Sequence, residues 1–268
     1  MLNAALLPKL KELRLSGILD TLDRRAGQAQ QDGLTPVEFL ALLLDDEIER
    51  RRQSRLIRQE RDAGLDASKR LSLFDFTAVP GLDRRRILDL SSCEFIARKD
   101  NWLVSGPTGT GKSHLTSAIG LEALARGYRV SAVSANRMLG DLFAARADGS
   151  YPKRLHQLIS VDLLIVDDFG LRPVSSTGAE DLYEIIHRRY ERGSLVLTSN
   201  RAPQEWAELF GDPLLASAAL DRLTHHAHLT TITGESYRQR QRRLQFPPEA
   251  PDVDDLTPPT HGEEEGPD

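Results

Sequence analysis

The sequence has one cysteine and no long apolar run. With Cys93 alone, an internal disulfide and a cysteine-based zinc cluster are excluded, and the residue is best read as a small buried apolar side chain. No apolar run approaches the roughly 20 residues of a membrane-spanning helix, and the N-terminus lacks a signal-peptide pattern. We therefore expect a protein of the reducing cytoplasm that has no membrane partner.

The formal net charge of −5 is unevenly distributed. Residues 247–268 carry eight Asp or Glu, six prolines and no Lys or Arg. The rest of the chain, with 35 basic and 32 acidic residues, is weakly basic at about +3. Few large apolar residues occur in the acidic segment, so we predict a disordered, solvating tail over residues 246–268.

The remaining sequence divides into three parts. Residues 1–66 predict a small all-α domain, because leucines recur at helical spacing and Thr35-Pro36-Val37-Glu38 is a helix start. Residues 67–100 are a connector. In residues 101–245 apolar strands alternate with helices, which predicts an α/β fold with a mostly parallel five-stranded sheet between helices. The expected strands are residues 102–104, 129–134, 163–166, 195–198 and 230–232.

A phosphate-binding loop directly follows the first predicted strand. It reads Gly106-Pro107-Thr108-Gly109-Thr110-Gly111-Lys112-Ser113, which is G-x-x-x-x-G-K-[ST]. Glycines let the backbone N–H groups converge on an anion, and the helix that follows adds its N-terminal dipole. We expect Lys112 to reach the β- and γ-phosphates of ATP and Ser113 to ligate Mg²⁺. No N-K-x-D motif for guanine is present, which disfavours GTP.

Two later strands end in polar side chains. Residues 163–166 are continuously apolar and lead into Asp167 and Asp168, the Walker B pattern. Asp167 is expected to hold Mg²⁺ through water, and Asp168 to orient or deprotonate the attacking water. If the strand at 195–198 lies between the other two, Asn200 reaches the γ-phosphate. The alternatives are that the acids begin a solvated loop and that Asn200 merely ends a strand.

Four motifs in this order resemble the IstB-like branch of the AAA+ ATPases, over about residues 1–245. They are GPTGTGKSHL, LLIVDDFG, LVLTSN and ALDRLTHHA. These proteins are insertion-sequence transposition helpers related to DnaC-type helicase loaders. The resemblance implies that Asn200 is a sensor residue, that Arg222 is an arginine finger acting on ATP of a neighbouring subunit, and that Arg238 is a second sensor. The residues alone leave both arginines open to a structural surface role.

The chain departs from the wider AAA+ pattern at Walker B. Most members carry Asp-Glu there, whereas this chain has Asp167-Asp168. The second carboxylate is one methylene shorter, so we expect a weaker hold on water and a turnover that depends on a partner or on DNA. The acidic tail is also outside the family pattern.

Two segments, one rich in arginine and one rich in histidine, are candidates for binding DNA or a metal ion. From Arg50 to Arg61 there are six arginines and one glutamate, which fits either contacts to DNA phosphates or a solvated helix end. No helix-turn-helix or zinc signature is evident, so DNA binding should not depend on sequence. His225, His226 and His228 have no second ligand cluster nearby in the sequence, which favours polar packing or a phosphate contact over a metal.

The resemblance implies an ATP-dependent regulator of transposition. As a homo-oligomer it would assemble on duplex DNA with ATP, hydrolyse ATP at subunit interfaces and direct a cognate transposase to target sites. The alternative is a DnaC-like loader of a replicative helicase, and the sequence of the N-terminal domain leaves its partner open. A small-molecule kinase is disfavoured because nothing resembles an arginine-rich lid over an acceptor site.

Overall fold

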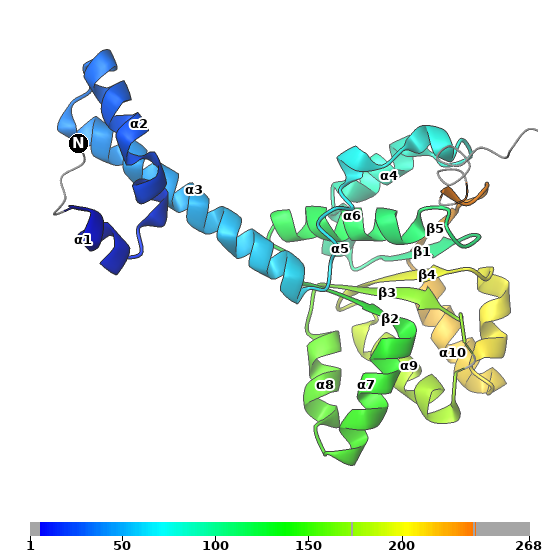
Figure 1. Ribbon diagram of the computed structural model, residues 1–268. Helices are drawn as coiled ribbons and strands as arrows, with labels where there is room; N and C mark the ends of the chain where they lie inside the picture. Colours follow the sequence, from blue (N-terminus) through cyan, green and yellow to red (C-terminus); the bar gives the residue numbers. More distant parts are fainter. Residues whose placement is uncertain (1–5, 173, 238, 240–268) are drawn as a thin grey trace, which may run out of the picture.

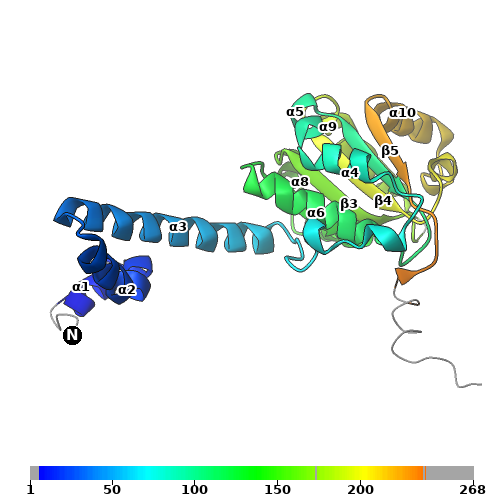
Figure 2. The same ribbon diagram turned by 90° about the horizontal axis from the view of Figure 1, so that it is seen from above.

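The computed structural model describes residues 6–172, 174–237 and 239. An arm of helices projects from an α/β body in two perpendicular views (Figures 1 and 2). The predictions for Arg238 and for the acidic tail at 246–268 lie outside the described residues. Within them, no helix is both long and apolar enough to cross a bilayer.

The arm consists of three helices, which are α1 (Leu6–Glu12), α2 (Ser16–Asp32) and α3 (Pro36–Asp62). The start of α3 is the predicted capping box: the Glu38 N–H donates to the Thr35 hydroxyl, and the Thr35 N–H donates to the Glu38 carboxylate at 2.8 Å. A small core of Leu10, Ile18, Leu22 and Leu43 joins the helices. The far end of α3 meets the body, where the Ala132 N–H donates to the Ala63 carbonyl at 2.7 Å.

The body contains a five-stranded parallel sheet in the order β2-β3-β4-β1-β5. This confirms the predicted fold. The strands are β1 (Asn101–Ser105), β2 (Val130–Ser134), β3 (Leu163–Phe169), β4 (Ser194–Ser199) and β5 (Ala227–Thr231). The last strand begins three residues earlier than predicted, because Ala227 and His228 pair with β1 although a histidine interrupts the apolar pattern. Since all strands run the same way, their carboxyl ends share one edge.

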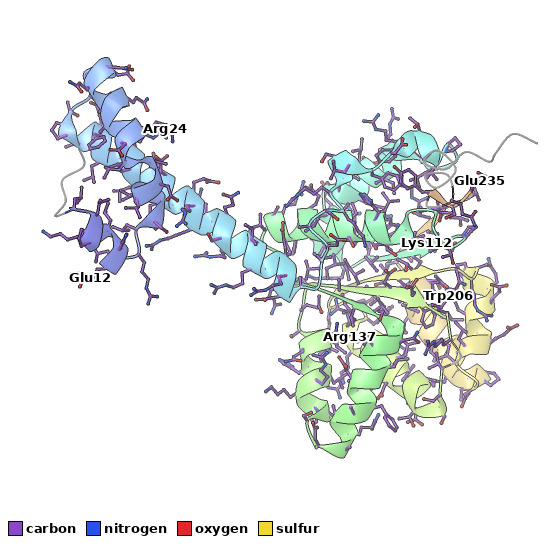
Figure 3. All side chains as sticks on the ribbon, in the orientation of Figure 1. Glu12, Arg24, Lys112, Arg137, Trp206 and Glu235 are labelled. Carbon is purple, nitrogen blue, oxygen red and sulfur yellow. The ribbon has the colours of Figure 1, made fainter. Side chains whose placement is uncertain are left out.

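Helices cover both faces of the sheet. One face packs against α4 (Arg84–Ser91), α5 (Glu94–Arg98) and α6 (Lys112–Ala125). The other packs against α7 (Ala135–Ala147), α8 (Tyr151–Ile159), α9 (Ser176–Arg189) and α10 (Pro213–Thr224). Short 3₁₀ turns connect them: η1 (Leu71–Leu73), η2 (Phe76–Ala78) and η3 (Pro203–Leu209). Lys112 and the fully buried Trp206 of η3 lie on opposite sides of the sheet (Figure 3). Cys93 is buried as predicted, and burial raises the pKa of its thiol to about 11.

A buried arginine ties the sheet to the loops at its amino edge. The Arg189 side chain is 2% exposed. Its guanidinium donates to four main-chain carbonyls, those of Leu158, Val161, Asp162 and Ser194, at 2.6–3.3 Å. Burial lowers the pKa of Arg189 to about 10, which leaves the side chain charged at neutral pH. The hydrogen bonds to Leu158 and Ser194 are buried, where water does not readily replace a missing donor.

Replacing Arg189 with methionine should therefore destabilise the protein by about 3 kcal/mol or more, since two buried and two part-buried carbonyls lose a donor. Urea unfolding monitored by circular dichroism measures the change. The neighbouring Arg188 is exposed and pairs with Glu184, so Arg188→Met should change the free energy of unfolding by about 0.5 kcal/mol or less. Equal effects of the two variants would contradict this role for Arg189.

Candidate nucleotide-binding site

The phosphate loop joins β1 to α6 at the carboxyl edge of the sheet. Its backbone turns at Gly109 and Gly111, whose φ angles of +85° and +97° are accessible to glycine but strained for other residues. The Gly106 N–H donates to the Ser199 carbonyl at 3.2 Å, and the Thr110 hydroxyl donates to the Pro107 carbonyl at 2.8 Å. The loop is thus fixed to β4 and directs the free N-terminal amides of α6 toward one place.

Lys112, the first residue of α6, keeps its ammonium group inside the loop. The side chain is 6% exposed, and Nζ donates to the carbonyls of Gly106 and Pro107 at 2.7 and 2.8 Å. Burial lowers the pKa of Lys112, while the nearby Asp168 and Asp167 carboxylates act in the opposite direction. A buried cation whose hydrogen bonds go to main-chain carbonyls is well suited to an anionic ligand, because charge-assisted hydrogen bonds are about twice as strong.

Oxygen-bearing side chains from three elements meet beside the loop. The Ser113 hydroxyl donates to Oδ1 of Asp167 at 3.0 Å, and the Thr198 hydroxyl donates to the same oxygen. β4 lies between β1 and β3, which meets the condition under which Asn200 was expected to reach the γ-phosphate. Hydroxyl and carboxylate oxygens without nitrogen or sulfur are the ligands that Mg²⁺ prefers. The residues present therefore fit a magnesium ion, with Ser113 and Asp167 as its nearest groups.

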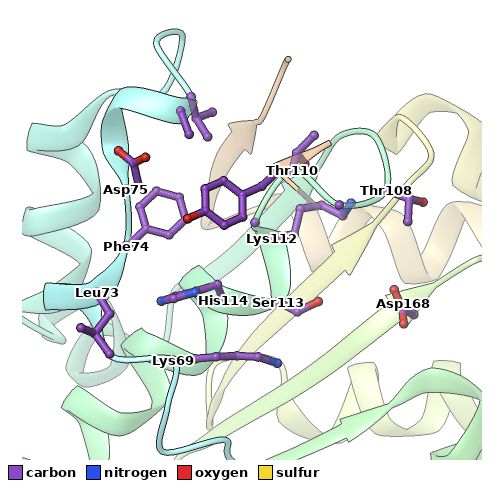
Figure 4. Close-up of a pocket in the computed structure, with 15 residues that line it drawn as sticks. Lys69, Leu73, Phe74, Asp75, Thr108, Thr110, Lys112, Ser113, His114 and Asp168 are labelled. Atoms are coloured by element: carbon purple, nitrogen blue, oxygen red, sulfur yellow. The ribbon is translucent and has the colours of Figure 1, made fainter. Parts of the chain in front are cut away.

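Asp168 leaves the strand in an unusual conformation. Its φ angle is +57°, and the pairing of β3 with β4 is irregular between Val166 and Phe169. Its N–H donates to the Thr198 hydroxyl at 3.0 Å. This kink brings the exposed carboxylate to the wall of the cavity that contains the phosphate loop (Figure 4). Backbone strain of this kind is concentrated at functional positions.

The cavity has a volume of about 360 Å³. Most residues of its second wall belong to none of the sequence motifs. Phe74, from the connector, packs edge-on against His114 with ring centroids 5.3 Å apart. Tyr237 lies on the same cavity, and its N–H donates to the Gly109 carbonyl at 2.9 Å. Phe74 lines the cavity, and Phe76 packs edge-on against the Phe74 ring without lining it. Tyr237, His114 and Lys69 were missed, because only tertiary packing brings them to the loop.

Of the predicted site residues in the described part of the chain, five do not line this cavity. Three of them (Gly106, Pro107 and Asp167) are in the loop or contact Ser113, whereas Asn200 and Arg222 lie elsewhere. Asn200 is exposed and directly follows Ser199, whose carbonyl accepts the hydrogen bond from Gly106. It therefore lies next to the loop, at the end of the central strand. Arg222 is at the opposite edge of the sheet: its guanidinium donates to the Ala218 carbonyl at 2.7 Å, and the adjacent Leu223 carbonyl accepts from Asn101 at the start of β1. One chain does not bring Arg222 to its own phosphate loop.

Comparison with known proteins agrees with this site. A family described as "IstB-like ATP binding protein" matches residues 8–245. A putative ATP-binding protein in an insertion sequence of Mycobacterium tuberculosis is 40% identical over 241 residues, covering 90% of this chain and 96% of the relative. The putative ATP-binding protein of insertion sequence IS5376 from Geobacillus stearothermophilus is 38% identical, covering 87% of this chain and 93% of the relative.

Solved structures extend the likeness to the fold. AMPPCP-bound DnaA from Aquifex aeolicus is 25% identical with a TM-score of 0.52, over 68% of this chain and 56% of that chain. The structure of DnaI is 22% identical with a TM-score of 0.53, over 61% of this chain and 90% of that one. Such likenesses identify an AAA+ P-loop fold. The chain's curated relatives are encoded in insertion sequences. Since the family match spans the helical arm as well as the body, the chain belongs to the IstB-like ATP-binding proteins.

Proposed function

We propose that this protein is an ATP-hydrolysing regulator of transposition, which assembles on duplex DNA with ATP and directs a cognate transposase to target sites. One observation carries the ATPase part: the phosphate loop, the Ser113–Asp167 contact and the kinked Asp168 converge at the carboxyl edge of the sheet. The insertion-sequence origin of the relatives supports the transposition part.

Each side chain of the site would have a separate role in ATP hydrolysis. The loop amides and Lys112 would bind the phosphates, and Ser113 and Asp167 would hold Mg²⁺, which supplies charge neutralisation when bound. Asp168 would accept a proton from the attacking water or orient it. Asn200, at the end of β4 beside the loop, would contact the γ-phosphate and help to position the same water. Because water is the attacking group, the reaction is a hydrolysis and needs no substrate besides ATP and water.

Arg222 would complete the site of a neighbouring subunit. Its place at the amino edge of the sheet separates it from the loop of its own chain. When the arginine end of one copy meets the phosphate-loop end of the next, the two copies form a head-to-tail interface. Repeating such an interface generates rings or helical filaments. This arrangement supports a homo-oligomer in which each ATP lies between two copies. The proposed role of Arg238 as a second sensor rests on the family resemblance alone.

The helical arm supports contact with DNA. One groove on the arm is lined by five arginines, which are Arg14, Arg50, Arg51, Arg55 and Arg58. Glu47 pairs with Arg51 at 2.6 Å and reduces the positive charge there, while Arg55 and Arg58 remain exposed. Arginines on one face can bind successive phosphates without reading bases. The affinity for duplex DNA should therefore be independent of sequence and fall steeply with salt.

A helicase loader of the DnaC type remains the second candidate. It is favoured only by the fold shared with DnaI. The insertion-sequence relatives match more of this chain, including the arm, at 37–40% identity. Affinity capture with ATP present separates the two: the full-length chain should retain the transposase encoded beside it and should not retain a replicative helicase. Retention of the helicase alone would favour the loader.

The function is tested by ATP hydrolysis of the full chain, measured with and without duplex DNA alongside particle size by light scattering. We expect larger particles with ATP and faster hydrolysis with DNA. Lys112→Ala should weaken ATP binding by about 100-fold or more, because two or more charge-assisted hydrogen bonds are lost. Lys153→Ala, at an exposed position on α8, is the matched control. Normal ATP affinity in Lys112→Ala, measured by fluorescent-nucleotide titration, would overturn the assignment of the loop.

A further inference from the structure

A cluster of two histidines and one glutamate lies at the amino edge of the sheet, far from the phosphate loop. His225 and His226 follow α10, and Glu191 is in the turn after α9. One ligand atom from each lies within 4.8 Å of the other two, and all three residues are exposed. Among the residues that the structure describes, no other set meets this criterion. The sequence alone does not reveal the third member, because Glu191 precedes the histidines by more than thirty residues.

We propose that Glu191, His225 and His226 form a binding site for a zinc ion or a similar divalent transition metal. Two imidazoles and one carboxylate are a known zinc ligand set, and three protein ligands leave a fourth position for water or another molecule. Zinc bonds of about 2.1 Å would place the ligand atoms about 3.4 Å apart. Exposed side chains that already lie within 4.8 Å reach that separation through small rotations. The proposal does not rest on ATP hydrolysis, although Glu191 lines the same cavity as Arg222, the proposed arginine finger.

Two local features support this reading. The hydroxyl of Tyr190 is hydrogen-bonded to Nδ1 of His225 at 2.7 Å, which orients the ring, so a metal would bind this histidine through Nε2. Metal-binding histidines almost always have such a partner on the other nitrogen. Glu191 has a φ angle of +59°, an uncommon conformation for glutamate.

The surrounding charges determine which kind of metal ion can bind at this site. Arg192 and Arg222 line the adjoining cavity, and their positive charges oppose any cation. A hard ion such as Mg²⁺, which binds through charge and prefers oxygen, should therefore bind poorly. Zinc gains from bonds to the imidazole nitrogens, which carry no charge when they are ligands. The site should thus select zinc over magnesium.

Equilibrium dialysis of the metal-free full chain with Zn²⁺, in excess Mg²⁺ to occupy the oxygen ligands at Ser113 and Asp167, tests the proposal. We expect one Zn²⁺ per chain at neutral pH. His226→Ala should weaken zinc binding by about 100-fold or more, and Tyr190→Phe by about tenfold. His156→Ala, at an exposed position on α8, should leave it unchanged. ATP affinity, which uses the other edge of the sheet, serves as the check that each variant is folded.

Co²⁺ provides a second readout, because its visible absorption is strong in a tetrahedral site with nitrogen ligands and weak in an octahedral oxygen site. A strong Co²⁺ spectrum that disappears in His226→Ala and persists in His156→Ala supports the site. Absence of stoichiometric zinc binding to the wild-type chain would overturn the proposal. So would equal zinc affinities of folded His226→Ala and His156→Ala.

Discussion

Asp168→Asn should lower the rate of ATP hydrolysis by about 10²–10⁴-fold while ATP binding is retained, because the amide cannot accept a proton from water. Asparagine has nearly the same shape as aspartate. It also tolerates the left-handed conformation seen at φ +57°, so the kink between β3 and β4 should persist. Single-turnover hydrolysis and nucleotide titration measure the two quantities separately.

A suitable control for this substitution is Asp148→Asn. That carboxylate is on the surface between α7 and α8, where it accepts hydrogen bonds from Ser150. The Asp148→Asn protein should hydrolyse ATP at the wild-type rate. Hydrolysis within about tenfold of wild type in Asp168→Asn would exclude Asp168 as the main group that activates water.

Arg222→Ala should reduce hydrolysis in the assembled protein by about 10³–10⁵-fold, the range found for loss of an arginine finger. ATP affinity should change little, because Arg222 does not line the cavity of its own chain. The guanidinium lies near Tyr183, with Cζ 5.8 Å from the ring centroid, so the variant also loses some packing on the surface. Thermal unfolding should nevertheless show a folded protein, since the side chain is not buried.

The same charge change at Arg126 is the matched control for Arg222→Ala. Arg126 directly follows α6, on the other face of the sheet, and pairs with Glu122 at 2.8 Å. Its removal should leave hydrolysis unaltered. A loss of ATP binding in Arg222→Ala equal to the loss of hydrolysis would argue for a structural role and against a finger.

The parts of the site that the sequence predicted are those encoded by short contiguous motifs. The phosphate loop follows a strand, and Asp167 and Asp168 end another, so the parallel fold alone brings them to one edge. The contact between Ser113 and Asp167 follows directly from that arrangement. The fold class was predictable for the same reason, since alternating apolar strands and helices admit few topologies.

The parts that the sequence did not predict depend on packing between distant segments. Phe74 and Tyr237 reach the cavity from the connector and from beyond β5, and neither belongs to a local pattern. Arg189 has four carbonyl partners that no motif specifies. Glu191 meets His225 and His226 only because α9 and α10 end side by side. Long-range contacts of this kind require the folded chain.

The central claim is that each ATP is hydrolysed between two copies of the chain, with Asp168 from one and Arg222 from the next. Mixing the Asp168→Asn and Arg222→Ala proteins tests it most directly, after co-assembly with ATP and duplex DNA has been verified with differently tagged chains. Each variant alone lacks one half of every interface. In a random equal mixture, about a quarter of the head-to-tail interfaces combine an intact Asp168 with an intact Arg222. We therefore expect hydrolysis to recover to about a quarter of the wild-type rate. Co-assembled mixtures that remain as inactive as the separate variants would contradict the shared site.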